Sequence, residues 1–160
     1  MLDAWHLFKR DARYANHRLI VAGEFYDDRS RYESLLAKLG NSVILHDRFV
    51  ADDEVKYYFS AVDALVLPYR TATQSGVTQI AYNFSTPMVV TDVGGLPEIV
   101  PDDKVGFVVP PTVDGIVDAI NQLYEADNLD RFCRNMANER KRFSWATMCD
   151  KIVEVYNKTK

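Results

Sequence analysis

A chain of 160 residues is long enough for one domain and too short for two well-formed ones. Its 19 lysine and arginine residues against 23 aspartate and glutamate residues give a net charge of −4, which argues against a binder of nucleic acid or of anionic membranes, because either needs a basic face. No apolar run approaches the roughly 20 residues that a membrane-spanning helix needs.

Short aliphatic and β-branched runs alternate along the chain with longer segments of helical period. We expect a first helix over residues 3–14 and a strand over 19–22 that ends at Gly23. A helix over 28–39 and a strand over 43–45 come next. The pattern then repeats in the middle of the chain.

The middle and the end of the chain continue this alternation. Asp52 is a plausible N-cap for a helix over 53–61. Further expected elements are a strand over 64–67, a helix over 76–84, strands over 88–90 and 107–109, and helices over 113–125, 129–141 and 144–157.

Runs that are apolar on both faces are typical of parallel strands covered by helices on each side. The alternation therefore predicts an α/β fold, a Rossmann-like doubly wound parallel sheet of about five strands with right-handed crossovers. Such sheets usually open on a strand, whereas this chain opens on a helix. We therefore interpret residues 1–160 as a single domain of a larger protein, with its first strand absent.

The aromatic residues and the cysteines have simple structural interpretations. The helical tryptophans and tyrosines are expected in the core or on half-buried helix faces, and we expect Trp145 to cover apolar surface and to matter for stability. These residues are Trp5, Tyr57, Tyr58, Tyr124, Trp145 and Tyr156. Cys133 and Cys149 fit no zinc spacing, and with no signal peptide at the N-terminus we expect reduced thiols in the cytoplasm.

Ligands of open α/β sheets bind outside the carboxyl ends of the strands. That rule selects the four loops that follow the first four strands. They comprise Gly23 to Phe25, then Asp47, Arg48, Phe49 and Val50, then Pro68 to Gly76, and finally Asp92 to Gly95.

The loop from Pro68 to Gly76 is the most informative of the four. It is polar, contains Arg70, Thr73 and Gln74, and leads into a helix at Ser75 and Gly76. A helix start offers free backbone N–H groups and the positive end of the helix dipole, and this makes it a natural phosphate site. The alternative, about equally supported by this loop alone, is an ordinary N-cap at Ser75 and a solvated charge at Arg70.

Other motifs are weak or missing. Gly94 and Gly95 form a glycine-rich turn, but neither GxGxxG nor GxxxxGK[ST] occurs, so a simple tight turn is the alternative. His6, His17 and His46 lie in unrelated segments and no DxD motif occurs, so no metal site is expected. No GxSxG sequence exists to carry a hydrolase nucleophile.

Four stretches, in order, resemble the C-terminal, nucleotide-sugar-binding domain of the retaining GT-B glycosyltransferases of group 1 (family 4). The most specific is STPMVVTDVGGLPEIVPDDKVGFVVPP, which is similar to the G-x-P-V-V, G-G-x-x-E and G-x-l-v signature of that family. The others are LIVAGE, VILHDRFVADDEVKYYFSAVDALVLPY and the terminal KRFSWATMCDKIVEVY. The resemblance covers essentially the whole chain.

The resemblance implies the donor-binding half of a two-domain enzyme, in which the diphosphate of a sugar nucleotide rests on Ser75, Gly76 and Val77. It places the base near Arg48 to Val50 and the ribose near Gln79. No metal or other cofactor is implied, since the helix start and basic side chains stabilise the leaving diphosphate. The implied partner is the enzyme's own N-terminal acceptor domain, and any peripheral membrane contact would lie in that missing half.

The sequence departs from the family at two positions, one expected near the sugar and one on the ribose. The family usually carries two glutamates seven residues apart, and here Thr73 and either Gln79 or Ile80 stand at these places. Catalytic residues are therefore left unassigned. Thr73 or Gln74 could still bind a sugar hydroxyl and Gln79 a ribose hydroxyl, with Gly23, Arg70, Gly94 and Gly95 completing the candidate donor site.

Three functions remain open at this point. The first is a sugar transferase, with surface polysaccharide as the expected acceptor class and with this chain inactive alone. The second is a nucleotide-binding domain without catalysis, and the third is an epimerase or phosphorylase on the same scaffold. Fold alone does not separate them, because function lies in the site.

Overall fold

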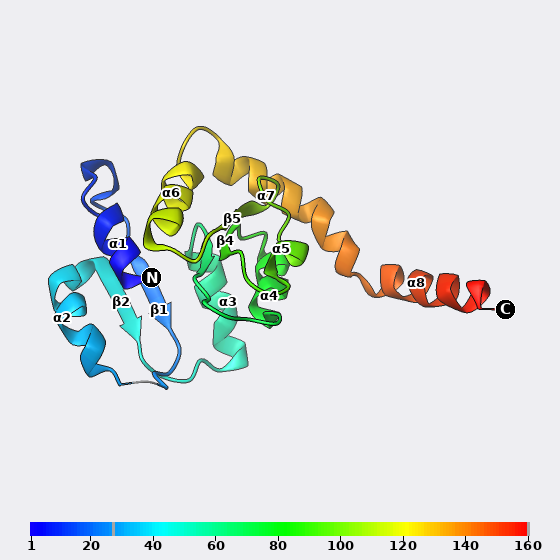
Figure 1. Cartoon of the computed structure of the whole chain (residues 1–160), viewed down its shortest axis with the longest axis horizontal. Coiled ribbons are helices and arrows are strands. Elements are labelled where there is room, and N and C mark those ends of the chain that lie inside the picture. Colours follow the sequence, from blue (N-terminus) through cyan, green and yellow to red (C-terminus); the bar gives the residue numbers. More distant parts are fainter. Residues whose placement is uncertain (27, 160) are drawn as a thin grey trace.

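In a computed structural model, five short parallel strands alternate with helices along a single chain (Figure 1), and the structure describes residues 1–26 and 28–159. The strands are β1 (Leu19–Ala22), β2 (Val43–His46), β3 (Leu65–Leu67), β4 (Met88–Thr91) and β5 (Gly106–Val109). The predicted α/β class with parallel strands is confirmed.

α-Helices of 10, 10, 9 and 4 residues separate the successive strands. The α-helices are α1 (Leu2–Phe8), α2 (Ser30–Leu39), α3 (Asp52–Ala61), α4 (Gly76–Phe84), α5 (Leu96–Ile99), α6 (Val113–Leu123), α7 (Asn128–Glu139) and α8 (Trp145–Lys158). Three short 3-10 turns complete the elements: η1 (Ala12–Tyr14), η2 (Gly40–Ser42) and η3 (Arg140–Phe143).

The strands pair in two groups within the described residues. β1 pairs with β2 from Leu19↔Val43 to Ala22↔His46, and β4 lies between β3 and β5. Every pairing is parallel, so within each group the carboxyl ends of the strands share one edge. The loops of the candidate site therefore leave the sheets at these edges.

β4 is the centre of the core, with all four residues buried. Met88 and Val90 pack with α4 and α5, whereas Val89 faces the opposite way and packs with Ala119 and Leu123 of α6. Helices thus cover both faces of this sheet, as predicted. On the α4 side, burial raises the pKa of Tyr82 to about 12, and its hydroxyl donates to the Ile99 carbonyl at 2.7 Å.

α1 and α6 pack together and join the two strand groups. Trp5 and Phe8 of α1 share one buried cluster with Ile116 and Ile120 of α6, and residues of β1, β2, β3 and β5 border that cluster. The burial of Trp5 is as predicted. The position of α1 and α6 over both strand groups fixes the four candidate loops relative to one another.

Two expectations about element ends are wrong, and one short helix was not expected. The first helix ends at Phe8 rather than residue 14, because the Asp11 side chain accepts from Arg13 N and starts the separate turn η1. Asp52 is the first residue of α3 rather than its cap, since Ala51 occupies the cap position. The single turn α5 was not predicted, because four residues are too few to show a helical period.

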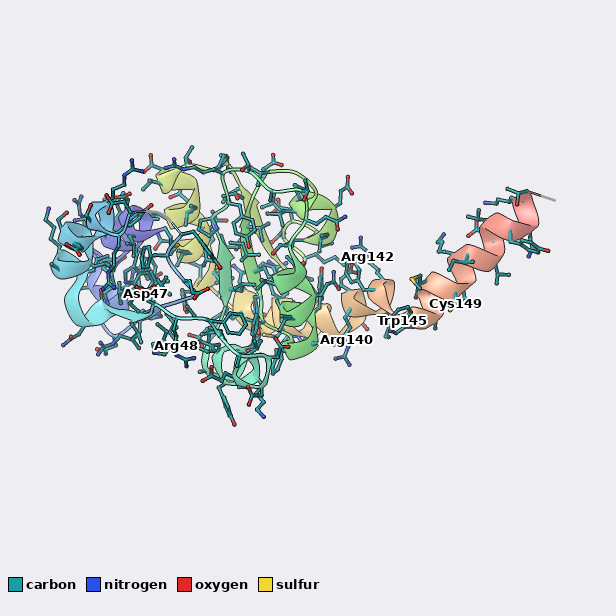
Figure 2. All side chains as sticks on the ribbon, turned by 90° about the horizontal axis from the view of Figure 1, so that it is seen from below. Asp47, Arg48, Arg140, Arg142, Trp145 and Cys149 are labelled. Carbon is teal, nitrogen blue, oxygen red and sulfur yellow. The ribbon has the colours of Figure 1, made fainter. Side chains whose placement is uncertain are left out.

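The expectation for Trp145 is also wrong. α8 extends away from the body of the molecule (Figures 1 and 2), and the Trp145 side chain is 78% exposed. Ser144 caps α8 after the chain has left the core, so the tryptophan has no apolar surface of the body to cover. Tyr57 and Tyr156, expected to be at least half-buried, are also exposed, whereas Tyr58 and Tyr124 are partly buried.

We therefore expect Trp145→Ala to change the free energy of unfolding of this chain by no more than about 0.5 kcal/mol, as for other exposed sites. The matched control is Trp5→Ala, which empties a buried site and should cost about 3–5 kcal/mol. Urea unfolding followed by circular dichroism measures both. A loss at Trp145 that approached the loss at Trp5 would contradict the exposed position of α8.

No helix among the described residues is both long enough and apolar enough to cross a membrane.

The two thiols differ in their surroundings. Cys149 is exposed on α8 (Figure 2), and Cys133 is partly buried in α7, where burial raises the pKa of its thiol.

Candidate functional site at the carboxyl ends of the strands

The four candidate loops form two hydrogen-bonded pairs. Gly95 N donates to the Thr73 carbonyl at 2.9 Å and so joins the loop after β4 to the loop after β3. Phe25 N donates to Asp47 Oδ1 at 3.3 Å and so joins the loop after β1 to the loop after β2. The structure therefore brings the predicted loops together in pairs.

The start of α4 faces open space. Ser75 is the cap residue, with an extended backbone, and a Cβ atom built on Gly76 would meet no atom within 4 Å. The first N–H groups of a helix have no partners within the helix, so a ligand can approach them here. The Val77 side chain packs against the core, which leaves its backbone as the part that an anion can contact.

Ser75 does not cap the helix with its side chain. Its hydroxyl lies 3.3 Å from the Tyr69 hydroxyl, and the residue is 8% exposed. Its carbonyl instead accepts from Thr78 Oγ1 at 2.6 Å and from Thr78 N at 3.2 Å. Ser75 thus occupies the expected N-cap position without a hydrogen bond from its side chain to the helix, and Thr78 holds the first turn.

The glycine pair is required by close backbone packing. Gly94 has a φ of +54°, and a Cβ atom there would lie 1.7 Å from the Ala72 carbonyl oxygen. A Cβ atom on Gly95 would lie 2.9 Å from the Thr73 oxygen. These glycines let the loop after β4 lie directly against the loop that leads into α4.

The other side chains near α4 are accessible. Arg70, Thr73 and Gln74 are exposed, and Gln79 is half-buried in the first turns of α4. Among the described residues, no hydrogen bond or ion pair engages the Arg70 guanidinium. The solvated-charge interpretation therefore fits this structure, and the same charge remains free to meet an anion.

Arg48 forms an ion pair, in contrast to Arg70. Its guanidinium forms a two-pronged ion pair with Glu54, with Nη1 to Oε2 at 2.6 Å and Nη2 to Oε1 at 2.8 Å. The hydrogen bond with Arg48 and a second from Ala51 N lower the pKa of Glu54 to about 2. Next to this pair, Phe49 is 68% exposed and Val50 is partly buried.

The sequence analysis assigned no individual role to Asp47 and Glu54, two acidic residues of this region. Asp47 accepts from Phe25 N, and its Oδ2 pairs with Arg29 Nη1 at 2.8 Å. Glu54 pairs with Arg48, as described above. The available signal was weak: Glu54 is the third residue of α3, the usual place for a glutamate that accepts from the cap residue. Gly23 ends β1 with a φ of +132°, and its N–H donates to His46 O.

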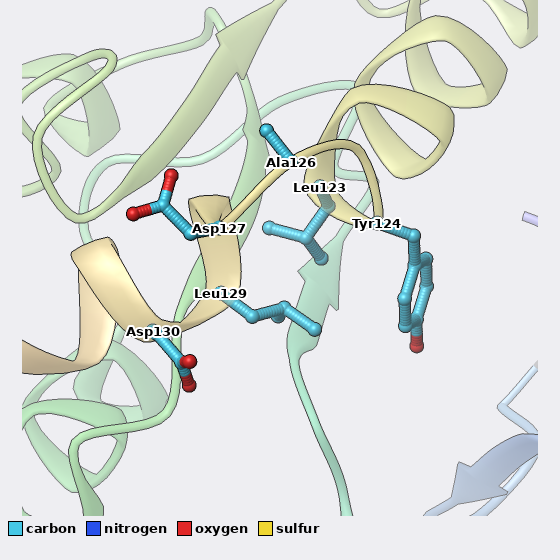
Figure 3. A pocket seen from close by; sticks show the side chains of 6 residues that line it. All are labelled: Leu123, Tyr124, Ala126, Asp127, Leu129 and Asp130. Carbon is cyan, nitrogen blue, oxygen red and sulfur yellow. The ribbon is translucent and has the colours of Figure 1, made fainter.

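The surface hollows lie away from these loops. A shallow one of about 210 Å³ is lined by Leu123, Tyr124, Ala126, Asp127, Leu129 and Asp130 (Figure 3). Another, of about 420 Å³, includes Val62 and Pro87, which precede β3 and β4. Neither hollow is lined by a predicted site residue. No group of three or more potential metal ligands gathers in residues 1–26 and 28–159.

Comparisons with known proteins give one consistent result. The family described as "Glycosyl transferases group 1" matches residues 1–126. A glycosyltransferase of Methanocaldococcus jannaschii without an assigned activity is 28% identical over 88% of this chain and 37% of its own length. A D-inositol 3-phosphate glycosyltransferase of Streptomyces bingchenggensis is 28% identical over 94% of this chain and 35% of its own length.

Solved structures share the fold. A sucrose-phosphate synthase from Thermosynechococcus elongatus aligns with a TM-score of 0.74 at 22% identity, over 99% of this chain and 42% of its own. The C-terminal domain of a group 1 glycosyl transferase from Francisella tularensis gives the same TM-score at 20% identity, over 86% of this chain and 74% of its own. The chain spans about a third of the length of the curated relatives it matches.

Proposed function

The chain belongs to the group 1 glycosyl transferases, and on that premise we propose that it is the part of a sugar transferase that binds a nucleotide-sugar donor. The observation that carries the proposal is the open start of α4. There, Gly76 borders free space and the exposed Arg70 stands on the preceding loop. Such a helix start binds the phosphates of a donor through backbone N–H groups and the helix dipole.

The donor extends along the paired loops. Its diphosphate rests on Ser75, Gly76 and Val77, with the glycine pair behind them. Its ribose contacts Gln79, and its sugar meets Thr73 or Gln74. The base lies against the loop from Arg48 to Val50.

The reaction retains the configuration at the anomeric carbon and needs no metal. As the bond to the sugar breaks, negative charge grows on the leaving diphosphate, and the N–H groups at the start of α4 stabilise that charge together with Arg70. No catalytic acid or base is assigned. The acceptor domain lies in the remainder of a longer cytoplasmic protein, so this chain alone binds the donor without transferring sugar.

We propose no specific acceptor for the sugar. Relatives carry names with different products, among them an alpha-(1->4)-mannosyltransferase of Mycolicibacterium hassiacum and an alpha-maltose-1-phosphate synthase of Mycolicibacterium smegmatis. A glycan or lipid of a surface polysaccharide fits the family equally well. We therefore assign a glycosyl transferase without naming its sugar or acceptor.

A second function is a donor-binding domain without catalysis, and one observation favours it. Thr73 and either Gln79 or Ile80 stand where the family usually has glutamates, and none of these side chains can act as a carboxylate. A protein that also contained the acceptor domain would transfer sugar under the first proposal and only bind nucleotide under the second. Epimerisation of the bound sugar nucleotide would indicate a GT-B-fold epimerase.

A titration of this chain with UDP, GDP, ADP and NAD, followed by two-dimensional NMR, tests donor binding. We expect one nucleoside diphosphate to shift the amide signals of residues 48–50, 70–79 and 93–95, and its identity names the base. Shifts confined to other residues would place the nucleotide elsewhere. The absence of shifts with all four compounds would contradict donor binding by this chain.

A further inference from the structure

The loop between β2 and α3 is held by a closed set of hydrogen bonds around one carboxylate. Both oxygens of Glu54 accept from the Arg48 guanidinium, and Arg48 Nη1 also donates to the Phe49 carbonyl at 3.1 Å. Ala51 N donates to Glu54 Oε2 at 3.3 Å. All four partners lie within residues 48–54, so the set fixes the path of the loop itself.

This arrangement contributes more to geometry than to stability. The side chains of Arg48 and Glu54 are 52% and 34% exposed, and exposed ion pairs typically add only about 0–1 kcal/mol to the free energy of unfolding. A guanidinium that binds a carboxylate through two parallel N–H groups nevertheless has one preferred orientation. The Phe49 carbonyl, held by the same guanidinium, is oriented with it.

The same loop is fixed from its other end. Arg48 N donates to the His46 carbonyl at 3.0 Å at the end of β2, and Asp47 joins the loop to Phe25 N and Arg29. Asp47 and Arg48 lie on the body of the molecule, away from the projecting α8 (Figure 2). The backbone from 46 to 51 is thus tied at both ends.

What this fixed loop presents is an aromatic ring. Phe49 is 68% exposed, so its ring is accessible to a ligand. Aromatic side chains bind nucleobases by stacking, at about 1–3 kcal/mol per base. A ring on a loop that is already ordered loses less entropy on binding than a ring on a loose loop.

We propose that Glu54 is a positioning residue, which acts through Arg48 to hold the Phe49 loop in the shape that receives the nucleobase of the donor. This inference rests on the proposed function, since it assigns the base end of that same donor. Glu54 itself does not touch the nucleotide. Its effect is therefore specific for ligands that carry a base, and the phosphate end at α4 is independent of it.

The test compares two probes on the wild-type chain and on Glu54→Gln. The probes are inorganic pyrophosphate and whichever of UDP, GDP and ADP binds most tightly, with dissociation constants from calorimetry. Glutamine at this position still accepts from Ala51 N, so the start of α3 is kept while the ion pair is lost. We expect the affinity for the nucleoside diphosphate to fall about tenfold and that for pyrophosphate to stay within twofold.

Two further variants make the assignment specific. Glu154→Gln removes another exposed, ion-paired carboxylate, on α8, and should leave both affinities unchanged. Arg48→Met should weaken nucleotide binding as Glu54→Gln does, and the double variant should be no weaker than either single one, because the two residues act as a unit.

The outcomes separate the two proposals. Equal losses for both probes, or no loss for either, would overturn the positioning role of Glu54 and leave donor binding intact. A wild-type chain that binds neither nucleotide nor pyrophosphate would overturn the proposed function, and the role of Glu54 with it.

Discussion

Replacing Gly94 with alanine is expected to lower the free energy of unfolding by more than about 3 kcal/mol, within the range that only severe mechanisms reach. The new Cβ atom would lie 1.7 Å from the Ala72 carbonyl oxygen, and its three nearest atoms all belong to the backbone of Ala72 and Thr73, so no flexible side chain can move aside. The positive φ of +54° adds strain of its own for any residue with a Cβ atom. Thermal unfolding and urea titration measure the loss.

Two glycines of the same chain separate these causes. Gly40 has a similar φ of +50°, but a Cβ atom there meets nothing within 4 Å, so Gly40→Ala reports backbone strain alone, about 1–3 kcal/mol. Gly76→Ala has neither cause and should be close to neutral. If Gly94→Ala were no less stable than Gly40→Ala, the close packing of the loops after β3 and β4 would be refuted.

The sequence predicted the strands well, because buried parallel strands consist of short aliphatic runs that turn residues interrupt. The strand ends differ by single residues: Ala64 lies outside β3, and Gly106 extends β5. His46 also extends β2, and Thr91 extends β4, where the Thr91 hydroxyl donates to the Tyr69 carbonyl at 2.6 Å. Such bonds to a neighbouring strand depend on the folded chain. They leave no trace in a pattern of apolar residues.

Trp145 shows a different limit of prediction from the sequence. Its apolar neighbours on α8, among them Met148, Ile152 and Val153, have helical spacing, and helical spacing normally indicates a face buried against the same domain. In this structure the whole face is exposed. A period in the sequence predicts that a helix has an apolar face, but not which surface covers that face.

The candidate site was partly predictable for a physical reason. The carboxyl ends of parallel strands select the loops, and a glycine at a helix start selects the phosphate position. The positions of Asp47 and Glu54 were not predictable, because each acts through bonds to backbone groups of loops whose path is known only after folding. The sequence likewise does not show that Arg48 forms an ion pair whereas the Arg70 guanidinium forms none among the described residues.

Gly76→Asp is expected to weaken binding of the nucleoside diphosphate by at least tenfold. The carboxylate would stand at the first residue of α4, where the proposal places the diphosphate. At about 4 Å, two like unit charges repel by roughly 1 kcal/mol in water and about 4 kcal/mol near a protein surface. Calorimetric titration measures the loss, which should shrink as salt screens the repulsion.

Loss of fold does not explain that result, because an acidic residue at a helix N-terminus typically stabilises the helix by about 0.3–1 kcal/mol. The melting temperature of Gly76→Asp should therefore equal or exceed that of the wild-type chain. Gly76→Asn has nearly the same shape without the charge, and it should retain most of the affinity that Gly76→Asp loses. Equal losses in the two variants would indicate a steric effect, and unchanged affinity in Gly76→Asp would place the diphosphate away from α4.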